Sequence, residues 1–180
     1  TTVTINPANP VTVGNDTVYI YSTDTTGNIE NRTALISTGS NNYGIYAAGR
    51  ATNLGNINYD SGIGNVGMYA VSGGRVINGS TTVNSVIKVS ASDRTNKLFG
   101  IGMAAGYTWT KKDLEKPVSQ RPEQTTGNII NRGTINVNGQ YSLGMYASGN
   151  GSTTENHGTI NLNADNTTGI YLTDKAVGHN

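Results

Sequence analysis

The sequence has no cysteine, little charge and no long apolar run, and each absence excludes a class of protein. Because cysteine is absent, neither a disulfide framework nor a thiolate metal site can form. The 12 basic and 11 acidic residues nearly cancel to a formal net charge of +1, which gives no reason to expect a nucleic acid or an anionic membrane as partner. No stretch approaches the ~20 apolar residues of a membrane helix, and the polar start at 1–6 is not a signal peptide. If the protein is exported, we expect its signal peptide to lie outside this sequence.

The composition favours a narrow, elongated β-structure. Only 34% of the residues are apolar, 13% are charged and 24 are glycine, which is too polar a mixture for a conventional two-layer globule of 180 residues. The 10 tyrosines and the regularly placed aliphatic residues argue against disorder, which depletes aromatic and β-branched residues. Since neither end offers a capping repeat, we expect residues 1–180 to form a single segment of a longer rod.

A four-residue motif, glycine followed by Ile or Met, Tyr and Ala, recurs along the chain. Its copies begin at Gly44, Gly67, Gly102, Gly144 and Gly169. The copy at Gly102 has lost its tyrosine, and the copy at Gly169 ends in leucine. The intervals are 23, 35, 42 and 25 residues, so the two long intervals predict insertions, at about 73–97 and about 107–126. We expect the first insertion to extend strands because it alternates, and the second, which is charged and broken by prolines, to project as a loop.

Each period contains three short strands separated by turns. A second recurring phrase, clearest at 127–131 and 133–137, supplies the other strands of the period. Alternation with a period of two then places the Ile or Met of the motif in a core and its tyrosine on the outside. The outward column contains Tyr46, Tyr69, Tyr146 and Tyr171, and Ala104 interrupts it.

Strands of this length are unstable alone, whereas coils stacked in register at ~4.8 Å bury a continuous apolar column. The sequence therefore predicts an all-β parallel β-solenoid, a β-helix of about six to seven coils with two insertions. Asn31, Asn131 and Asn156 fall at equivalent corners, where each side chain can bond its counterpart on the next coil. Gly133 and Gly158 are expected to adopt the positive φ that such corners commonly need.

Two exposed features are candidate binding sites for a partner. The tyrosine column offers contact area with a polar tip. A ladder of like aromatic residues also strengthens a sheet, and we favour this structural interpretation because the column runs the whole length. The charged insertion is the preferred site, since loops on rigid scaffolds commonly carry function, and a solvated loop without a role is the competing interpretation. Its candidate residues are Trp109, Lys111, Lys112, Asp113, Glu115, Lys116 and Arg121.

The phrases at 127–137 and 142–147 resemble the passenger repeats of large autotransporter adhesins of Gram-negative bacteria, particularly those of fusobacteria. The resemblance covers nearly the whole chain outside the two insertions. It implies type V secretion, a right-handed parallel β-helix, display at the outer-membrane surface, and binding of host or bacterial surface proteins or glycans. We expect contact with a membrane only through the family's C-terminal barrel, which this sequence does not include.

Parallel β-helices also carry polysaccharide lyases and hydrolases, whose chemistry requires acidic groups brought together. The aspartates here are scattered singly near turns, where aspartate is a routine turn former, so we expect no catalysis and no cofactor. They are Asp16, Asp24, Asp60, Asp93, Asp165 and Asp174. His157 and His179 could share a metal on neighbouring coils, but His157 takes the place of Arg132 in an equivalent corner and is expected to be simply exposed, with no metal bound.

The sequence is therefore interpreted as a non-catalytic adhesin segment that acts as a stalk or as a binding platform at the cell surface. A carbohydrate-active β-helix, either a lyase or a hydrolase, is the alternative, with a phage tail-fibre segment behind it.

Overall fold

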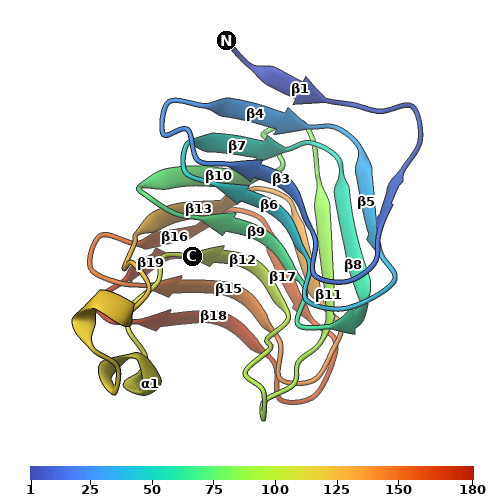
Figure 1. Cartoon of the computed structure of the whole chain (residues 1–180). Coiled ribbons are helices and arrows are strands. Elements are labelled where there is room, and N and C mark those ends of the chain that lie inside the picture. The colour runs from blue at the N-terminus through green and yellow to red at the C-terminus, as the bar shows by residue number, and fades with distance from the viewer.

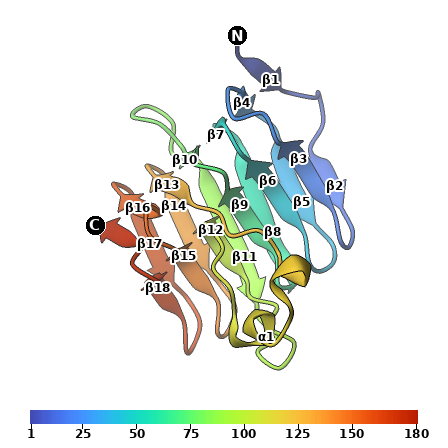
Figure 2. The ribbon, with the colours of Figure 1, turned by 60° about the vertical axis from the view of Figure 1, so that its left-hand side comes forward.

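The computed structural model describes all 180 residues and shows a right-handed parallel β-helix (Figure 1). The backbone winds through three parallel sheets, here called A, B and C, and each complete coil adds one strand to each sheet. Sheet A has seven strands and sheets B and C have six each, so six complete coils are followed by the first strand of a seventh. Figure 2 shows these coils side by side along the rod. The predicted fold class is confirmed.

The strands are short and every pairing between them is parallel. Sheet A contains β1 (Val3–Ile5), β4 (Asn28–Asn31), β7 (Arg50–Asn53), β10 (Gly74–Asn78), β13 (Gly127–Asn131), β16 (Thr153–Asn156) and β19 (Val177–His179). Sheet B contains β2 (Val11–Val13), β5 (Ala34–Ser37), β8 (Asn56–Ile63), β11 (Val86–Ala91), β14 (Thr134–Val137) and β17 (Thr159–Leu162). Sheet C contains β3 (Val18–Ser22), β6 (Tyr43–Ala47), β9 (Val66–Ala70), β12 (Ile101–Ala105), β15 (Leu143–Ser148) and β18 (Thr168–Thr173).

The core consists of columns, each made by equivalent residues of successive coils. In sheet C the Ile or Met of the motif forms one column, and in sheet B four aliphatic residues form another. The first column is Ile45, Met68, Met103 and Met145, and the second is Leu35, Ile57, Ile87 and Ile135, all of them fully buried. Because each coil covers the apolar side chains of the next, a strand too short to be stable alone is stabilised by both neighbours. The predicted inward orientation of the Ile and Met residues is confirmed.

The corner between sheets A and B is closed by a ladder of asparagines. In each coil the side-chain Nδ2 donates to Oδ1 of the counterpart in the next coil, at 2.8 to 3.0 Å. The members are Asn31, Asn53, Asn78, Asn131, Asn156 and Asn180. The predicted bonding of Asn31, Asn131 and Asn156 to neighbouring coils is confirmed, and the structure adds three further members.

The glycines of this corner are required by space and not by their φ angles. Gly133 and Gly158 do not have a positive φ, so that prediction is wrong. A Cβ on Gly133 would lie 2.1 Å from the carbonyl oxygen of Ser85, because successive coils pass backbone against backbone. The glycine of the four-residue motif is required for the same reason, since a Cβ on Gly102 would lie 2.6 Å from the carbonyl oxygen of Gly144.

The two long intervals between motif copies differ in structure. The segment 73–97 supplies β10 and β11, which take ordinary places in sheets A and B, and its other residues lie in turns and loops. Residues 79–85 form one of these, the β10–β11 loop. Between β12 and β13 lie two short helical segments, α1 (Lys111–Leu114) and the 3-10 helix η1 (Val118–Gln120). The structure contains no helix with the length and apolar character needed to span a membrane.

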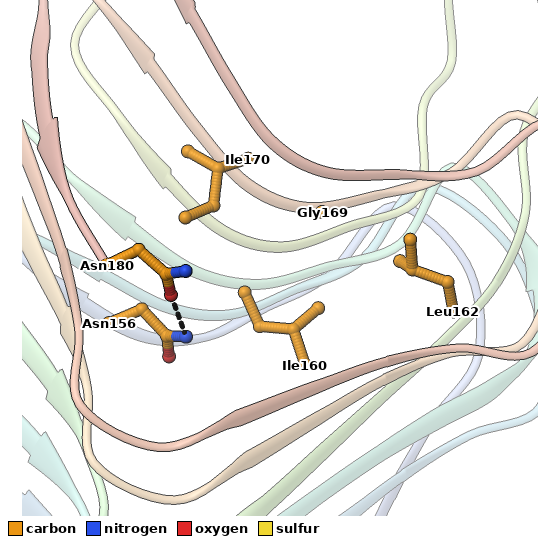
Figure 3. A pocket seen from close by; sticks show the side chains of 6 residues that line it. All are labelled: Asn156, Ile160, Leu162, Gly169, Ile170 and Asn180. Atoms are coloured by element: carbon orange, nitrogen blue, oxygen red, sulfur yellow. Dashed lines mark hydrogen bonds between the residues drawn. The ribbon is translucent and has the colours of Figure 1, made fainter.

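At the C-terminal end, the inner face of the last coil is open (Figure 3). The apolar side chains of Ile160, Leu162 and Ile170 surround a hollow of about 350 Å³. The hydrogen bond from Asn156 to Asn180, at 2.8 Å, lies at its edge. Both the apolar columns and the asparagine ladder therefore continue to the last coil.

Candidate functional site

The tyrosine column lies on the outer face of sheet C. The register pairs Tyr46 with Tyr69 and Tyr146 with Tyr171, and it adds Tyr21 of the first coil. The ring centroids are 5.3 Å apart for Tyr21 and Tyr46, 5.5 Å for Tyr46 and Tyr69, and 5.7 Å for Tyr146 and Tyr171. Each pair is stacked, and such pairs contribute about 0.5–1.5 kcal/mol beyond the area they bury. The column is thus a stacked aromatic ladder on the outer face of the sheet.

Ala104 interrupts the ladder as predicted. It is in register with Tyr69 on one side and with Tyr146 on the other. Ala104 is nevertheless fully buried, and the hydroxyl of Tyr69 donates to the carbonyl of Gly106. The chain leaving β12 therefore closes over the place where a further tyrosine ring would lie, and this burial raises the pKa of Tyr69.

The charged insertion is a folded loop held by hydrogen bonds around Asp113. Tyr107 and Thr125 form an antiparallel bridge at its base, and Thr110 caps α1. The N–H of Thr110 donates to Oδ2 of Asp113 at 2.9 Å, and the N–H of Asp113 donates back to Oγ1 of Thr110 at 3.2 Å. The hydroxyl of Tyr107 also donates to Asp113, and these bonds, that of Tyr107 first, lower the pKa of Asp113. Burial, followed by the bond to Asp113, raises the pKa of Tyr107 to about 12.

Trp109 and Arg121 join the two arms of the insertion. The Arg121 guanidinium lies 4.7 Å from the centroid of the Trp109 ring, which is a cation–π contact. The indole N–H of Trp109 donates to the carbonyl of Pro122 at 2.8 Å. Arg121 donates to the carbonyls of Lys116 and Leu114 at 2.9 and 3.2 Å. Of the residues expected to bind a partner, Trp109, Asp113 and Arg121 thus already have partners inside the loop.

The other four expected residues are exposed on or beside α1. Lys111, Lys112, Glu115 and Lys116 face solvent, and α1 lies outside the stacked strands (Figure 1). This cluster is here called the charged turn. It presents three cations and one anion that are free to meet a partner.

The insertion is fixed to the rod by both of its arms. The N–H of Ser72 donates to Oγ1 of Thr125 at 2.6 Å, and the N–H of Gly73 donates to the carbonyl of Thr126 at 2.9 Å. On the other arm, Oγ1 of Thr108 donates to Oδ2 of Asp174 at 2.7 Å. These contacts set the position of the insertion relative to the tyrosine ladder.

A groove of about 450 Å³ lies where the ladder meets the insertion. Its lining residues are Tyr43, Tyr46, Tyr69, Val71, Tyr107, Pro122, Glu123 and Thr125. Tyr43 stands at 83° to Tyr46 and at 61° to Tyr69, with centroids 6.4 and 6.0 Å apart. The groove is open to solvent, and its lining is mostly aromatic and apolar, with Glu123 and Thr125 among its polar groups. Tyr43 and Tyr107 were not among the predicted site residues. Tyr43 directly precedes the motif at Gly44, which is a sequence signal for it, whereas nothing comparable marks Tyr107.

Asp24 and Asp93 serve the turns in which they lie, whereas Asp60 and Asp174 accept hydrogen bonds from Asn138 and Thr108 of distant segments. Asp24 accepts hydrogen bonds from the N–H and hydroxyl of Thr26 at 2.9 and 2.7 Å. Asp93 accepts two hydrogen bonds from Asn96, one from its N–H and one from its side-chain amide. These hydrogen bonds lower the pKa of both carboxyl groups. Asp16 and Asp174 occupy turn positions with φ of 55° and 53°. No group of three or more Asp, Glu or His side chains gathers where it could hold a metal ion.

The two histidines lie on neighbouring coils, His157 directly after β16 and His179 at the end of β19. His157 is exposed, as predicted, and its Nε2 is 3.2 Å from Oε2 of Glu155. His179 is in register with Glu155 and is also exposed. Each histidine is thus a surface residue beside a single carboxylate.

Comparison with known proteins gives one match. The family model described as the BigA third pectate lyase-like domain matches residues 1–180. This match supports an autotransporter passenger-like domain, and it does not support the fusobacterial type suggested by the repeat phrases. Comparison with curated proteins and comparison with solved structures each returned no match.

Proposed function

The chain belongs to the family of BigA third pectate lyase-like domains, and from this premise we propose that it is a non-catalytic segment of an autotransporter adhesin. BigA itself is an autotransporter-like adhesin of Brucella. Display at the cell surface follows from this proposal. The segment acts there as a rigid platform that binds a surface protein or glycan of a host cell or of another bacterium.

The position of the insertion is the observation that carries the proposal. The insertion leaves the rod at the single break in the tyrosine ladder, and hydrogen bonds from Ser72 and Thr108 fix its two arms. The charged turn and the tyrosine groove are consequently held in a constant relation to each other. A contact surface fixed before binding loses little conformational entropy when the partner arrives.

The chemistry of this surface suits a macromolecular partner. Tyrosine supplies contact area with few rotatable bonds, and residues of this type dominate binding energy at interfaces. The lysines of the charged turn supply steering toward an acidic partner, an effect that weakens as salt is raised. Affinity should therefore reside mainly in the groove and association rate mainly in the charged turn.

Replacement of the insertion tests this proposal. Residues 109–123 are exchanged for a short Gly/Ser linker, which preserves the bridge between Tyr107 and Thr125. The control variant exchanges residues 94–97, which belong to the loop between β11 and β12. Binding of each variant to host cells and to bacterial cells is measured by flow cytometry. We expect the insertion variant to bind more weakly than the unchanged chain and the control to bind as the unchanged chain does. Equal binding by both variants, with circular dichroism unchanged, contradicts the assignment of the contact to the insertion.

The non-catalytic part of the proposal has its own test. No three acidic or histidine side chains gather in one place, and Asp24 and Asp93 are engaged in local turns, whereas glycoside chemistry needs paired acidic groups. The protein is incubated with neutral and acidic polysaccharides, and reducing and unsaturated ends are quantified. We expect no release above that of buffer. Release of either product would show that the chain is an enzyme.

A further inference from the structure

Two arginines lie side by side on the outer face of sheet A without a counter-charge. Arg50 of β7 and Arg75 of β10 are direct partners in the parallel register, and both are exposed. The chain has two ion pairs, one between Arg32 and Glu30 and one between His157 and Glu155. Neither Arg50 nor Arg75 takes part in an ion pair. Residues paired in this way lie ~4.8 Å apart, and like charges directly opposite each other are destabilising. A bound anion would relieve this repulsion.

A third arginine faces the same region from the next coil. Arg132 follows the corner asparagine, the position that Arg32 and His157 take in their coils. Those two residues each meet a carboxylate two positions earlier, whereas Arg132 has Ile130 at that place. The middle coils of sheet A therefore gather positive charge, while the carboxylates on both sides of them are neutralised locally.

A hollow joins this charge to the β10–β11 loop. It has a volume of about 260 Å³, and its polar lining includes Arg50, Arg132, Thr52 and Thr81. The hydroxyls of Thr52 and Thr81 have no hydrogen-bond partner within the chain, while Ser80 accepts bonds from its own loop. The hollow thus offers donors from two guanidinium groups and two hydroxyls, and it contains no acidic residue.

The arrangement matches a tetrahedral oxyanion better than a planar carboxylate. A carboxylate has two oxygens in one plane, which a single guanidinium satisfies with two parallel hydrogen bonds. A sulfate ester has three terminal oxygens that point in different directions, so it can accept from Arg50 and from a hydroxyl of the hollow together with a second guanidinium. Arg132 supplies that second guanidinium within the hollow, and Arg75 lies beside Arg50 outside it. We propose that the arginine site, defined as Arg50, Arg75 and Arg132, binds the sulfate esters of a sulfated glycan. This site is separate from the insertion and does not depend on the proposed adhesion contact.

The test compares two charge variants against two forms of one glycan. Arg50→Gln/Arg75→Gln removes the registered pair. The matched control Lys88→Gln/Arg94→Gln removes the same charge elsewhere, from β11 and from an arginine that packs 4.3 Å from the Tyr141 ring centroid. The probes are heparin and fully desulfated heparin, which keeps its carboxylates. Binding is measured at about 0.15 M salt, where exposed charges more than about 8 Å apart are largely screened.

We expect the unchanged chain and the control to bind heparin alike. The Arg50→Gln/Arg75→Gln variant should bind at least about tenfold more weakly, because charge-assisted hydrogen bonds are lost. Desulfated heparin should bind the unchanged chain at least about tenfold more weakly than heparin does. The proposal is overturned if heparin does not bind, if both charge variants lose affinity equally, or if desulfated heparin binds as well as heparin.

Thermal unfolding separates lost binding from lost folding. Without glycan, the Arg50→Gln/Arg75→Gln variant should melt no lower than the unchanged chain, because a repulsion between like charges is removed. Heparin should raise the melting temperature of the unchanged chain and of the control, and it should raise that of the double variant less. An equal rise in all three contradicts the site. Heparin binding without cell binding would leave this site standing and refute only the adhesion proposal.

Discussion

The interior of the asparagine ladder should be far less tolerant of substitution than its last coil. Asn78 is fully buried and makes three side-chain hydrogen bonds. Its Nδ2 donates to the carbonyl of Ser85 and to Oδ1 of Asn131, each at 3.0 Å, and its Oδ1 accepts from Asn53 at 3.0 Å. The substitution Asn78→Ala removes all three bonds.

The expected cost follows from the partners that are left behind. The carbonyl of Ser85 still accepts from the N–H of Thr134, and Oδ1 of Asn131 still accepts from the N–H of Gly133. The Nδ2 of Asn53 has no second acceptor and becomes a buried, unpaired donor. Three bonds at about 1 kcal/mol each, with about 1–2 kcal/mol for the unpaired donor, give about 4–5 kcal/mol.

Asn156→Ala is the matched comparison. Asn156 belongs to the same ladder but is only half-buried, and its bond to Asn180 is exposed, so water can replace the lost partners. The expected cost is about 1 kcal/mol. Urea unfolding followed by circular dichroism measures both variants against the unchanged chain. If Asn78→Ala costs no more than Asn156→Ala, the buried ladder does not stabilise the corner, and this reasoning is refuted.

Further substitutions and changes of pH probe the core, the motif and the insertion. Gly102→Ala should lower stability by about 1–3 kcal/mol in urea unfolding, because its Cβ would lie 2.6 Å from a carbonyl oxygen of the next coil; an unchanged midpoint would contradict this. Tyr59→Phe should leave stability equal or raise it by about 1–2 kcal/mol, since the buried hydroxyl of Tyr59 has no partner; a loss of stability would show that this hydroxyl is bonded. The lowered pKa of Asp113 means that its contribution is present above the ordinary value of 3.8 and is lost as the pH falls through the folded value. Fluorescence of Trp109, the single tryptophan, should therefore change in acid, and Asp113→Asn should remove that change. The raised pKa of Tyr107 has the opposite sign, so its contribution is present below 10 and is lost as the pH rises through about 12.

The features that could be predicted from the sequence are those that repeat within one coil. Alternation decides which side chains face inward, so the buried column containing Met68 and Met145 follows from local pattern alone. The gap at Ala104 follows from aligning one copy of the motif with the next. The family match supports the autotransporter part of the assignment and not its fusobacterial type, because a repeat that satisfies one β-helix satisfies many.

The features that were not predicted depend on contacts between residues of different coils. Asn53 and Asn78 were missed because the residues around them depart from the corner phrase, although the ladder has an asparagine in every coil from the second onward. The φ assigned to Gly133 was wrong because the restriction comes from the neighbouring coil and not from the turn itself. Tyr43 and Tyr107 meet in one groove only because the insertion folds back across sheet C, and no local pattern encodes that path.

This division explains where binding chemistry can reside in such a rod. A residue in a buried column touches its counterparts on both sides, so a change there disturbs three coils, and the interior is left to packing. An outward position carries no such restriction, and parallel register turns any outward repeat into a row of like groups spaced ~4.8 Å apart. The tyrosine ladder and the pair Arg50 and Arg75 are both rows of this kind, one apolar and one cationic. A row of equivalent weak contacts suits a polymer whose own groups repeat, because each further contact forms within an already bound complex and needs little affinity of its own.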